Sequence, residues 1–508
     1  MLPLTLDDRK RRKNQTKYTL ICFLIVLVVS CKKAVEIPSP SFGMAENAVY
    51  TIDATAISVL TGIYASLNSS GQFQGNKSIS LLTGLSSDEL TLFAAVTNKQ
   101  HIGYYNNLLT AVNQPVTGSE LWAPLFNYVY KCNAAIEGIT RSTSLTSLVK
   151  QQLQGEAKFM RAFFYFYLVN LFGDVPLALT IDPKDITVLA RSPKVKVYEQ
   201  IVKDLQDAKE LLSADYLNET LLATTSERVR PTKWAAAALL ARAYLFSGNW
   251  AKAETEATAL INNTALFNLL PLNEVFLKNS REAIWQIQPT ALYFNTQDAR
   301  TFIIPATGPS VGANATNPVS LSKNLLNSFE TGDQRAVYGN WVDTTIYKRT
   351  PSKWDTVAFV YKYKVNTINT DIDNSTGSQY MTEYFMVLRL AEQYLIRAEA
   401  RAQQGDINGA QADLNEIRRR AFEMPQPTTA ADKASLLTAI WHERQVELFC
   451  EWGHRWLDLK RTGSVDAVMS VVTPQKANGA SWQSYQQSYP IPLNDIKKAP
   501  NLVQNPGY

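Results

Sequence analysis

Residues 395–417 read LIRAEARAQQGDINGAQADLNEI, and residues 238–260 read ALLARAYLFSGNWAKAETEATAL. Small or apolar residues recur in both stretches at identical spacing, and a glycine divides each stretch at the same place (Gly405 and Gly248). Steps of three and four residues follow one helix face, and a glycine between two such runs predicts a turn. Each stretch therefore predicts a helical hairpin whose small alanines let two helices approach closely.

The same helical period continues outside these hairpins. Apolar stripes run through residues 121–139, 150–172 and 195–213. The repeated unit resembles a tetratricopeptide (TPR) repeat, and since two units are too few for a free-standing solenoid, we expect the other stripes to complete the stack. The predicted fold class is mostly α: a TPR-like scaffold of helical hairpins over about residues 121–262 and 386–460.

Two stretches break the helical pattern and predict an irregular lobe. Residues 70–118 and 263–383 are rich in Asn, Thr, Ser, Gly, Tyr and Phe, with short alternating runs such as AIWQIQ at 283–288. They are expected to form loops with short strands, and Asn295–Ser320 and Asn366–Ser378 are typical of long surface loops. Because long loops without secondary structure are usually functional, a ligand site is expected in this lobe.

The N-terminus is predicted to be a signal peptide over residues 1–30. A basic segment precedes an apolar run of about a dozen residues, YTLICFLIVLVV at 18–29, which is too short to span a bilayer. The residues before Cys31 resemble a bacterial lipobox, although Val28 stands where Leu is usual. Cys31 is therefore the predicted lipidation site, and the alternative is an ordinary signal peptide followed by a chance cysteine.

The residues after the leader predict a tethered and nearly neutral protein. Residues 31–45 form the predicted lipidated tether, with two prolines and little periodicity, and 46–508 form the body. The net charge of +5 belongs almost entirely to the first thirty residues, which hold six Lys and Arg against two Asp. Such a body is a poor nucleic-acid binder. Cys132 and Cys450 are expected as buried free thiols, with a disulfide between them as the alternative.

Five segments, in order along the body, resemble the motifs of the SusD/RagB family. They are Thr51–Leu67 (TIDATAISVLTGIYASL), Gly155–Leu177 (GEAKFMRAFFYFYLVNLFGDVPL), Arg389–Ala402 (RLAEQYLIRAEARA), Ile440–Arg461 (IWHERQVELFCEWGHRWLDLKR) and Tyr489–Tyr508 (YPIPLNDIKKAPNLVQNPGY). The fourth carries one inserted residue before its arginine, and Asp495 stands where the family usually has Glu. The five together make a joint pattern that no single segment would provide.

The resemblance implies a function without catalysis. Family members lie on the outer face of the outer membrane and close like a lid over a SusC-type TonB-dependent transporter. They bind oligosaccharides, or peptides in the RagB branch, and pass the ligand inward. A lipid-anchored capture protein of this kind, with oligosaccharide as the expected ligand, peptide as the alternative and no cofactor, is the function that the sequence predicts.

The acidic cluster near the C-terminus is interpreted as structural. Glu443, Glu447 and Glu451 recur every four residues and share a helix face, as paired carboxylates of a glycosidase could. The same segment holds the other members of a predicted ion-pair network, namely Arg444, Arg455, Asp458 and Arg461. Neighbouring guanidinium groups lower a carboxylate pKa, whereas a general acid needs a raised one.

Known catalytic and metal-binding motifs do not appear. His442-Glu443 begins like the zinc motif H-E-x-x-H, but Val446 occupies the second histidine position. No P-loop, dinucleotide fingerprint or nucleophile elbow is present, so no metal or cofactor is expected. Two rivals to the capture function remain open: a surface glycoside hydrolase, and a scaffold whose TPR-like helices bind only other proteins.

Aromatic residues of the two loop regions are the predicted ligand contacts, because sugar rings stack on aromatic rings while amides and carboxylates bind their hydroxyls. These candidates are Phe73, Phe93, Tyr104, Tyr105, Tyr293, Phe294, Trp341, Tyr347 and Trp354, with Asp88, Asn106 and Asn295 as polar partners. The aromatic stripe at 163–167, with Phe172, follows helical spacing and is instead expected to pack in the core.

Overall fold

The computed structural model describes residues 46–69, 73, 75–111, 120–290, 295–366, 381–476 and 481–508. Residues 50–508 form one unit, and the short helix α2 (Glu46–Val49) belongs to a separate N-terminal unit. The predicted signal peptide, Cys31 and the predicted tether lie outside the described residues. Within the described part, none of the helices combines the length and the apolarity needed to cross a bilayer.

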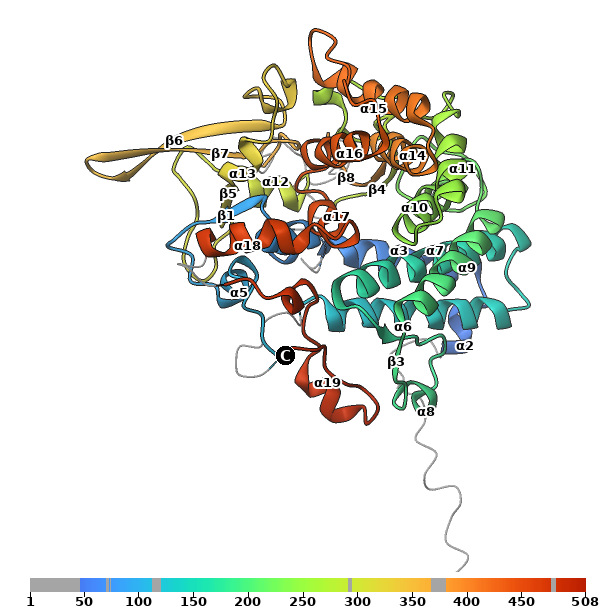
Figure 1. The fold of residues 1–508 in the computed structure, drawn as a ribbon. Coiled ribbons are helices and arrows are strands. Elements are labelled where there is room, and N and C mark those ends of the chain that lie inside the picture. The colour runs from blue at the N-terminus through green and yellow to red at the C-terminus, as the bar shows by residue number, and fades with distance from the viewer. Residues whose placement is uncertain are drawn as a thin grey trace, which may run out of the picture. The chain divides into compact units, whose positions relative to one another are not determined.

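The helices of the unit 50–508 stack in chain order over much of its length (Figure 1). Neighbouring helices pack in the sequence α6, α7, α9, α10, α11, α14, α15, with α16 on α14 and α15. Their bounds are α3 (Asp53–Ser69), α6 (Trp122–Arg141), α7 (Ser147–Phe172), α9 (Lys194–Leu211), α10 (Lys233–Phe246), α11 (Trp250–Ile261), α14 (Leu390–Gln404), α15 (Ile407–Ala421) and α16 (Lys433–Glu447). The chain ends with α17 (His454–Arg461), α18 (Val465–Lys476) and α19 (Leu493–Lys498).

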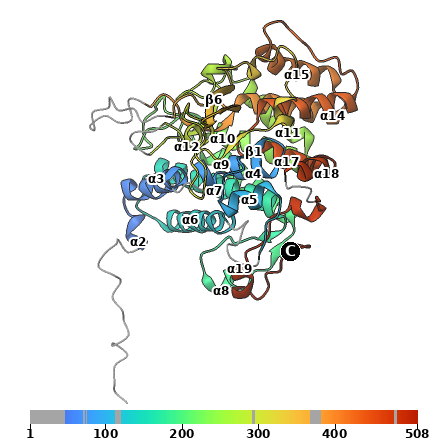
Figure 2. The ribbon, with the colours of Figure 1, turned by 90° about the vertical axis from the view of Figure 1, so that its left-hand side faces the viewer.

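The two predicted hairpins are confirmed. Gly248 separates α10 from α11 and Gly405 separates α14 from α15, and both adopt positive φ (73° and 88°), which favours glycine. The periodic alanines are fully buried, and those of α14 and α15 form one apolar core with α16. Figures 1 and 2 both show α14 and α15 side by side. The predicted fold class, a mostly helical TPR-like scaffold, is therefore correct.

Helix α7 is the central helix of the core. From Phe159 to Phe172 nearly all of its side chains are buried, so the aromatic stripe predicted to be core packing is confirmed as such. The Phe163 ring makes edge contacts with Trp285 and Trp452 at centroid distances of 5.6 and 5.4 Å. Cys132 and Cys450 are buried and free, as expected, and are not joined by a disulfide.

The C-terminal residues dock on the end of α7. The Asn505 Nδ2 donates to the carbonyls of Phe172 and Tyr489, each at 2.8 Å, and the Gln504 side chain exchanges two hydrogen bonds with the backbone of Ile491. A Cβ at Gly507 would lie 2.3 Å from the Tyr485 ring. The final motif is thus explained by close packing on α7, since neither bulkier nor apolar residues could make these contacts.

The remaining elements are short and include four two-stranded antiparallel sheets. The pairs are β1 (Leu90–Leu92) with β5 (Val319–Leu321), β2 (Val175–Pro176) with β3 (Arg191–Ser192), β4 (Ala283–Ile287) with β8 (Phe385–Arg389), and β6 (Val342–Thr350) with β7 (Lys353–Val360). The β6–β7 hairpin projects from the unit (Figure 1). Short helices are α4 (Ile79–Ser86), α5 (Lys99–Tyr105), α8 (Pro183–Ile186), α12 (Gln297–Phe302), α13 (Lys323–Leu326), and the 3-10 turns η1 (Gly75–Lys77), η2 (Leu272–Glu274), η3 (Gln334–Ala336) and η5 (Ser484–Gln487).

The structure corrects part of the predicted lobe. The strand predicted at 283–288 is present as β4, and 70–118 contains the short strand β1 as predicted, but it also holds the helices α4 and α5, which were not predicted. All eight residues of α4 are buried, so this helix has no exposed face and its sequence shows no amphipathic period. Asn295–Ser320 likewise contains α12, whereas most of Asn366–Ser378 lies outside the described residues.

Candidate ligand-binding cleft

An open cleft of about 350 Å³ lies where α3, the end of β4 and the chain before α10 meet. Most of its lining surface is apolar, as in typical small-molecule sites. The lining residues are Thr61, Tyr64 and Ala65 of α3, Val229 and Arg230, Ile287 at the end of β4, Gln288 to Thr290 after it, and Met381.

The cleft is lined by two residues that border the undescribed parts of the predicted loop-rich region 263–383. Thr290 and Met381, which line it, are the described residues next to 291–294 and 367–380. The Asn295 Oδ1 accepts hydrogen bonds from the backbone N–H groups of Thr382 (2.8 Å) and Glu383 (2.9 Å), and the Glu383 carboxylate accepts from the backbone N–H of Lys364 (2.5 Å). The first residue of Asn295–Ser320 and residues on both sides of Asn366–Ser378 are thus held together beside the cleft.

A charged network forms the cleft floor. The carboxylate of Glu156, on α7, accepts hydrogen bonds from the Tyr64 hydroxyl (2.8 Å), from Arg230 Nη1 (2.8 Å) and from Gln152 Nε2 (3.0 Å). The Arg230 Nη2 also donates to Thr61 Oγ1 at 2.7 Å. Burial and the Glu156 carboxylate raise the pKa of Tyr64 well above its usual value, so its hydroxyl stays protonated and keeps donating.

The cleft offers one partly exposed ring and two available polar side chains. Tyr64 is half-buried, with its ring near the guanidinium of Arg230 (5.9 Å to the centroid) and edge-on to Trp285. The side chains of Gln288 and Thr290 make no hydrogen bond within the described residues, although the Gln288 carbonyl accepts one from Asn68 Nδ2. A half-exposed ring beside a free amide and a free hydroxyl can stack on a sugar face and bind its hydroxyls.

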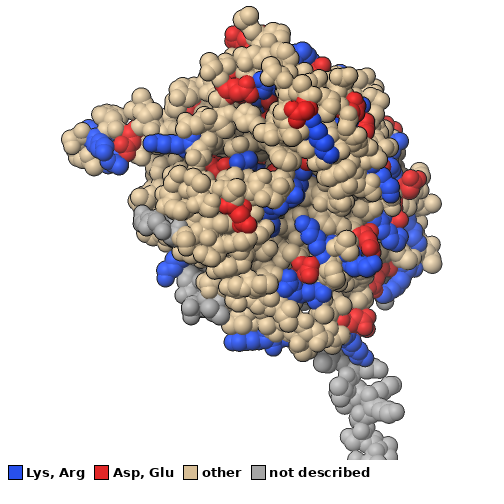
Figure 3. Space-filling view, viewed as in Figure 1, with Lys and Arg blue, Asp and Glu red and all other residues tan. Residues whose placement is uncertain are grey.

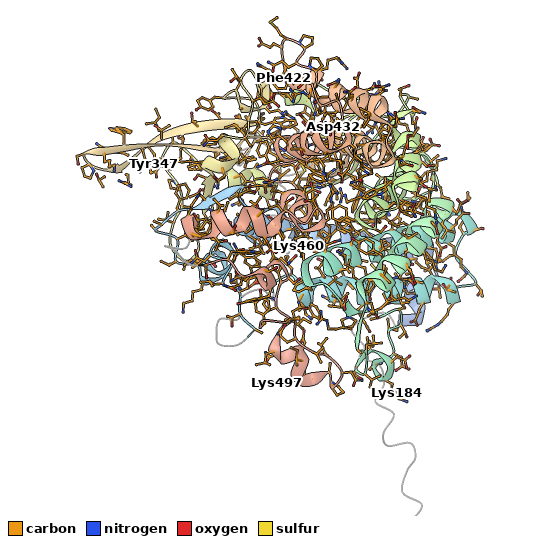
Figure 4. The ribbon with its side chains drawn as sticks, in the orientation of Figure 1. Lys184, Tyr347, Phe422, Asp432, Lys460 and Lys497 are labelled. Carbon is orange, nitrogen blue, oxygen red and sulfur yellow. The ribbon has the colours of Figure 1, made fainter. Side chains whose placement is uncertain are left out.

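Several predicted ligand contacts are buried, which contradicts their assignment. Trp341 and Tyr104 are 0 % exposed, and the Trp341 indole N–H donates to the Leu272 carbonyl at 2.8 Å. Stacking on a ligand needs an accessible ring face, and these rings have none. Phe73 is buried between core aromatics, and Tyr347 lies against Gly308 at the hairpin (Figure 4).

The predicted polar partners are mostly engaged within the protein. Asp88 is buried and accepts two hydrogen bonds from Arg455, at 2.7 and 2.8 Å. Asn295 is buried and holds the backbone beside the cleft. Both carboxylate and amide are therefore structural, which corrects the prediction that they contact ligand directly, whereas Asn106 is half-buried.

The accessible candidates do not gather in one place. Phe93 and Tyr105 are half-buried, and Trp354 is 62 % exposed on the projecting hairpin. Tyr293 and Phe294 lie outside the described residues. None of the predicted contacts with described positions lines the cleft.

The acidic cluster lies in a buried network of ion pairs, with Glu443 and Glu447 on α16. Glu451 comes after the helix has ended, so the prediction that all three share one helix face is wrong for Glu451. Glu447 pairs with Arg335, Arg389 and Arg420, Glu451 with Lys362 and Arg389, and Glu443 with Arg335 and Arg418. The remaining predicted members also pair: Arg444 with Asp458, Arg461 with Asp458 and Glu399, and Arg455 with Asp88.

These contacts set the protonation of the cluster. Burial disfavours the charged form of Glu447, but the guanidinium groups of Arg420, Arg389 and Arg335 outweigh it and lower its pKa. Burial is likewise outweighed at Glu451, where Arg389 and Lys362 lower the pKa. Carboxylates held ionised in this way serve as hydrogen-bond acceptors that fix helices. Among the described residues, no group of three or more His, Cys, Asp or Glu side chains is arranged to hold a metal ion.

The cleft residues escaped sequence reasoning because four distant segments supply them. Tyr64 belongs to a helix whose stripe predicts core packing, and Arg230 stands alone before α10. The one available signal was indirect: Thr290 and Met381 flank segments that composition predicted as loops.

Comparison with known proteins agrees with the fold. The family model described as "Starch-binding associating with outer membrane" matches residues 51–245, and the model described as "SusD family" matches residues 336–508. SusD-like protein P25 of Formosa agariphila is 24% identical over 95% of this chain and 97% of its own length. The starch-binding protein SusD of Bacteroides thetaiotaomicron is 37% identical over 24% of this chain and 21% of its own length.

A solved structure shows the same architecture. The protein titled "Laminarin binding SusD-like protein" superposes with a TM-score of 0.72 at 22% identity, covering 90% of this chain and 100% of that one. The helical-hairpin stack, the docked C-terminal motif and the two family matches agree with one another. The chain is a SusD-type protein of the SusD/RagB family.

Proposed function

We propose that this protein captures extracellular oligosaccharides non-covalently at the Tyr64 cleft and delivers them to a SusC-like TonB-dependent transporter. The observation that carries the proposal is the cleft itself: a half-buried tyrosine beside an amide and a hydroxyl that make no hydrogen bond within the described residues. The relatives described as starch-binding and laminarin-binding support a carbohydrate ligand.

The proposed anchor is a lipidated Cys31 that holds the protein on the outer face of the outer membrane. Two or more acyl chains on one cysteine give stable attachment. Tethering beside a transporter raises the effective ligand-site concentration and offsets weak binding at a shallow cleft. Replacement of Cys31 by Ser should release the protein from the membrane fraction and abolish palmitate labelling.

Calorimetry on purified protein tests the cleft, after a glycan array has identified a bound oligosaccharide. Tyr64→Ala should weaken binding about two- to twelvefold, because an aromatic contact contributes about 0.5–1.5 kcal/mol beyond burial. Tyr64→Phe keeps the ring and should retain most of the affinity. Tyr130, 48 % exposed on α6 and outside the cleft, provides the control, and Tyr130→Ala should change nothing.

Three results would contradict the proposal. Unchanged affinity in Tyr64→Ala would move the binding site elsewhere. Binding of peptides but of no oligosaccharide would replace the ligand class. Turnover of a glycan by the purified protein would replace capture with hydrolysis.

A further inference from the structure

Among the described residues that line the cleft, Arg230 alone is charged, and its charge is already neutralised within the protein. The guanidinium of Arg230 is only 8 % exposed at its side chain and pairs with the fully buried Glu156 at 2.8 Å. The same carboxylate is held by the Tyr64 hydroxyl and by Gln152, so it cannot turn away. Arg230 and Glu156 therefore act as a fixed, internally compensated pair.

A second carboxylate, that of Glu219, adds negative charge near Arg230. Burial alone would lower the pKa of Arg230, but the contact with Glu156 and, more weakly, the charge of Glu219 contribute to raising the pKa above its usual value. Glu219 is exposed and forms no ion pair within the described residues. The cationic group of the cleft thus has one carboxylate in contact and another close by.

Lys278, which is joined to the cleft margin through its backbone, is also paired. The Lys278 backbone N–H donates to the carbonyl of Thr382, the residue after Met381, and its ammonium lies 3.2 Å from Glu227. On the face seen in Figure 3, positive and negative side chains are interspersed, with no broad field of one sign.

We propose that the cleft selects uncharged oligosaccharides and rejects chains that carry uronate or sulfate groups, because Glu156 occupies the arginine that such groups would need. This inference rests on the proposed function and adds the charge class of the ligand. An incoming anion would have to displace a buried carboxylate from Arg230 or remain unpaired beside it, and an unpaired charge in a partly dehydrated cleft is strongly disfavoured. A neutral sugar meets neither penalty.

If Glu156 causes this selection, replacing it should shift the preference of the cleft toward anionic oligosaccharides. Glu156→Gln keeps the size and hydrogen-bonding capacity of the side chain but leaves the Arg230 charge uncompensated toward the cleft. The ratio of anionic to neutral affinity should then rise about tenfold at low salt, and the rise should shrink at high salt because the new attraction is electrostatic. Glu219→Gln, at an exposed position that folding does not depend on, should raise the same ratio about twofold.

The probes are neutral hexose hexamers and galacturonate hexamers, titrated at 20 mM and 300 mM salt. Wild type should bind a neutral hexamer at least tenfold more tightly than any galacturonate hexamer. Glu423→Gln, another exposed carboxylate but outside the cleft, is the control and should leave the ratio unchanged.

The outcomes separate the two claims. Galacturonate binding that equals or exceeds neutral binding in wild type, and that Tyr64→Ala weakens, would overturn the charge selection while leaving capture at the cleft intact. An unchanged ratio in both folded variants would also overturn it. Absence of binding by either probe class, extended across a full glycan array, would refute the proposed function itself.

Discussion

Replacing Arg389 by Met should destabilise the protein by about 4 kcal/mol. The Arg389 side chain is 2 % exposed and contacts Glu282 (3.0 Å), Glu447 (2.6 Å) and Glu451 (2.8 Å). Breaking a buried ion pair usually costs about 3–5 kcal/mol, since it strands the partner charge. The cost should not reach three times that value, because each carboxylate keeps another cation: Arg420 at Glu282 and Glu447, and Lys362 at Glu451.

The assay is urea unfolding followed by tryptophan fluorescence, with Arg419→Met as the matched control. Arg419 also pairs with a glutamate, Glu416, but both side chains are largely exposed (65 % and 43 %), so its loss should cost less than about 0.5 kcal/mol. Equal, small effects of the two variants would refute the argument that burial gives the Arg389 contacts their weight.

The pH dependence provides a second check on the same variant. The pKa values of Glu447 and Glu451 are lowered in the folded protein, so their contribution to stability is present above the unfolded value of about 4.3 and is lost as pH falls toward the folded values. Removing Arg389 raises these pKa values. The stability gap between wild type and variant should therefore be full at pH 7 and narrow below about pH 4, and a gap that widens on acidification would contradict this reasoning.

Two further predictions concern single buried contacts. Burial raises the pKa of Asp298 to about 7, although the backbone N–H of Gly75 donates a hydrogen bond to its carboxylate. The wild-type protein therefore loses stability as pH rises from about 4 to 7. Asp298→Asn should remove this loss, and urea unfolding should show a gain of about 2 kcal/mol over wild type between pH 5 and 7. Gly308→Ala should lower the melting temperature more than the control Gly339→Ala. Both glycines have positive φ, but only a Cβ at position 308 would lie 2.5 Å from the Tyr347 ring. Equal losses in melting temperature would show that backbone strain alone accounts for the effect.

The scaffold was predictable because its information is local and repeated. The alanine spacing around Gly248 and Gly405 appears twice, and each copy describes one complete hairpin, so no long-range contact had to be inferred. Helix α4 was not predictable in the same way, because full burial removes the polar face that marks a surface helix.

The site was harder to predict because burial of single residues in an irregular lobe depends on tertiary contacts. The composition around Trp341 is that of a loop, yet its indole is enclosed and faces the cations of Lys362 and Arg420. Conversely, Tyr64 sits in a helix with an ordinary apolar stripe and becomes part of a cleft only when Arg230 and Gln288 arrive from elsewhere. The spacing of residues along the chain does not predict either set of tertiary contacts.

Helix α11 packs directly against α14, although residues 262–389 separate them in the chain. The irregular lobe is therefore an insertion that begins after α11 and ends before α14. These two helices pack against each other, so their contact does not depend on the lobe. Such an arrangement allows the lobe to diverge in length and sequence, provided that the ion pair between Glu282 and Arg389, near its two ends, is kept. Exchange of this segment between relatives would replace the part of the cleft formed by Ile287 to Thr290 and Met381, while Tyr64 and Arg230 stayed in place.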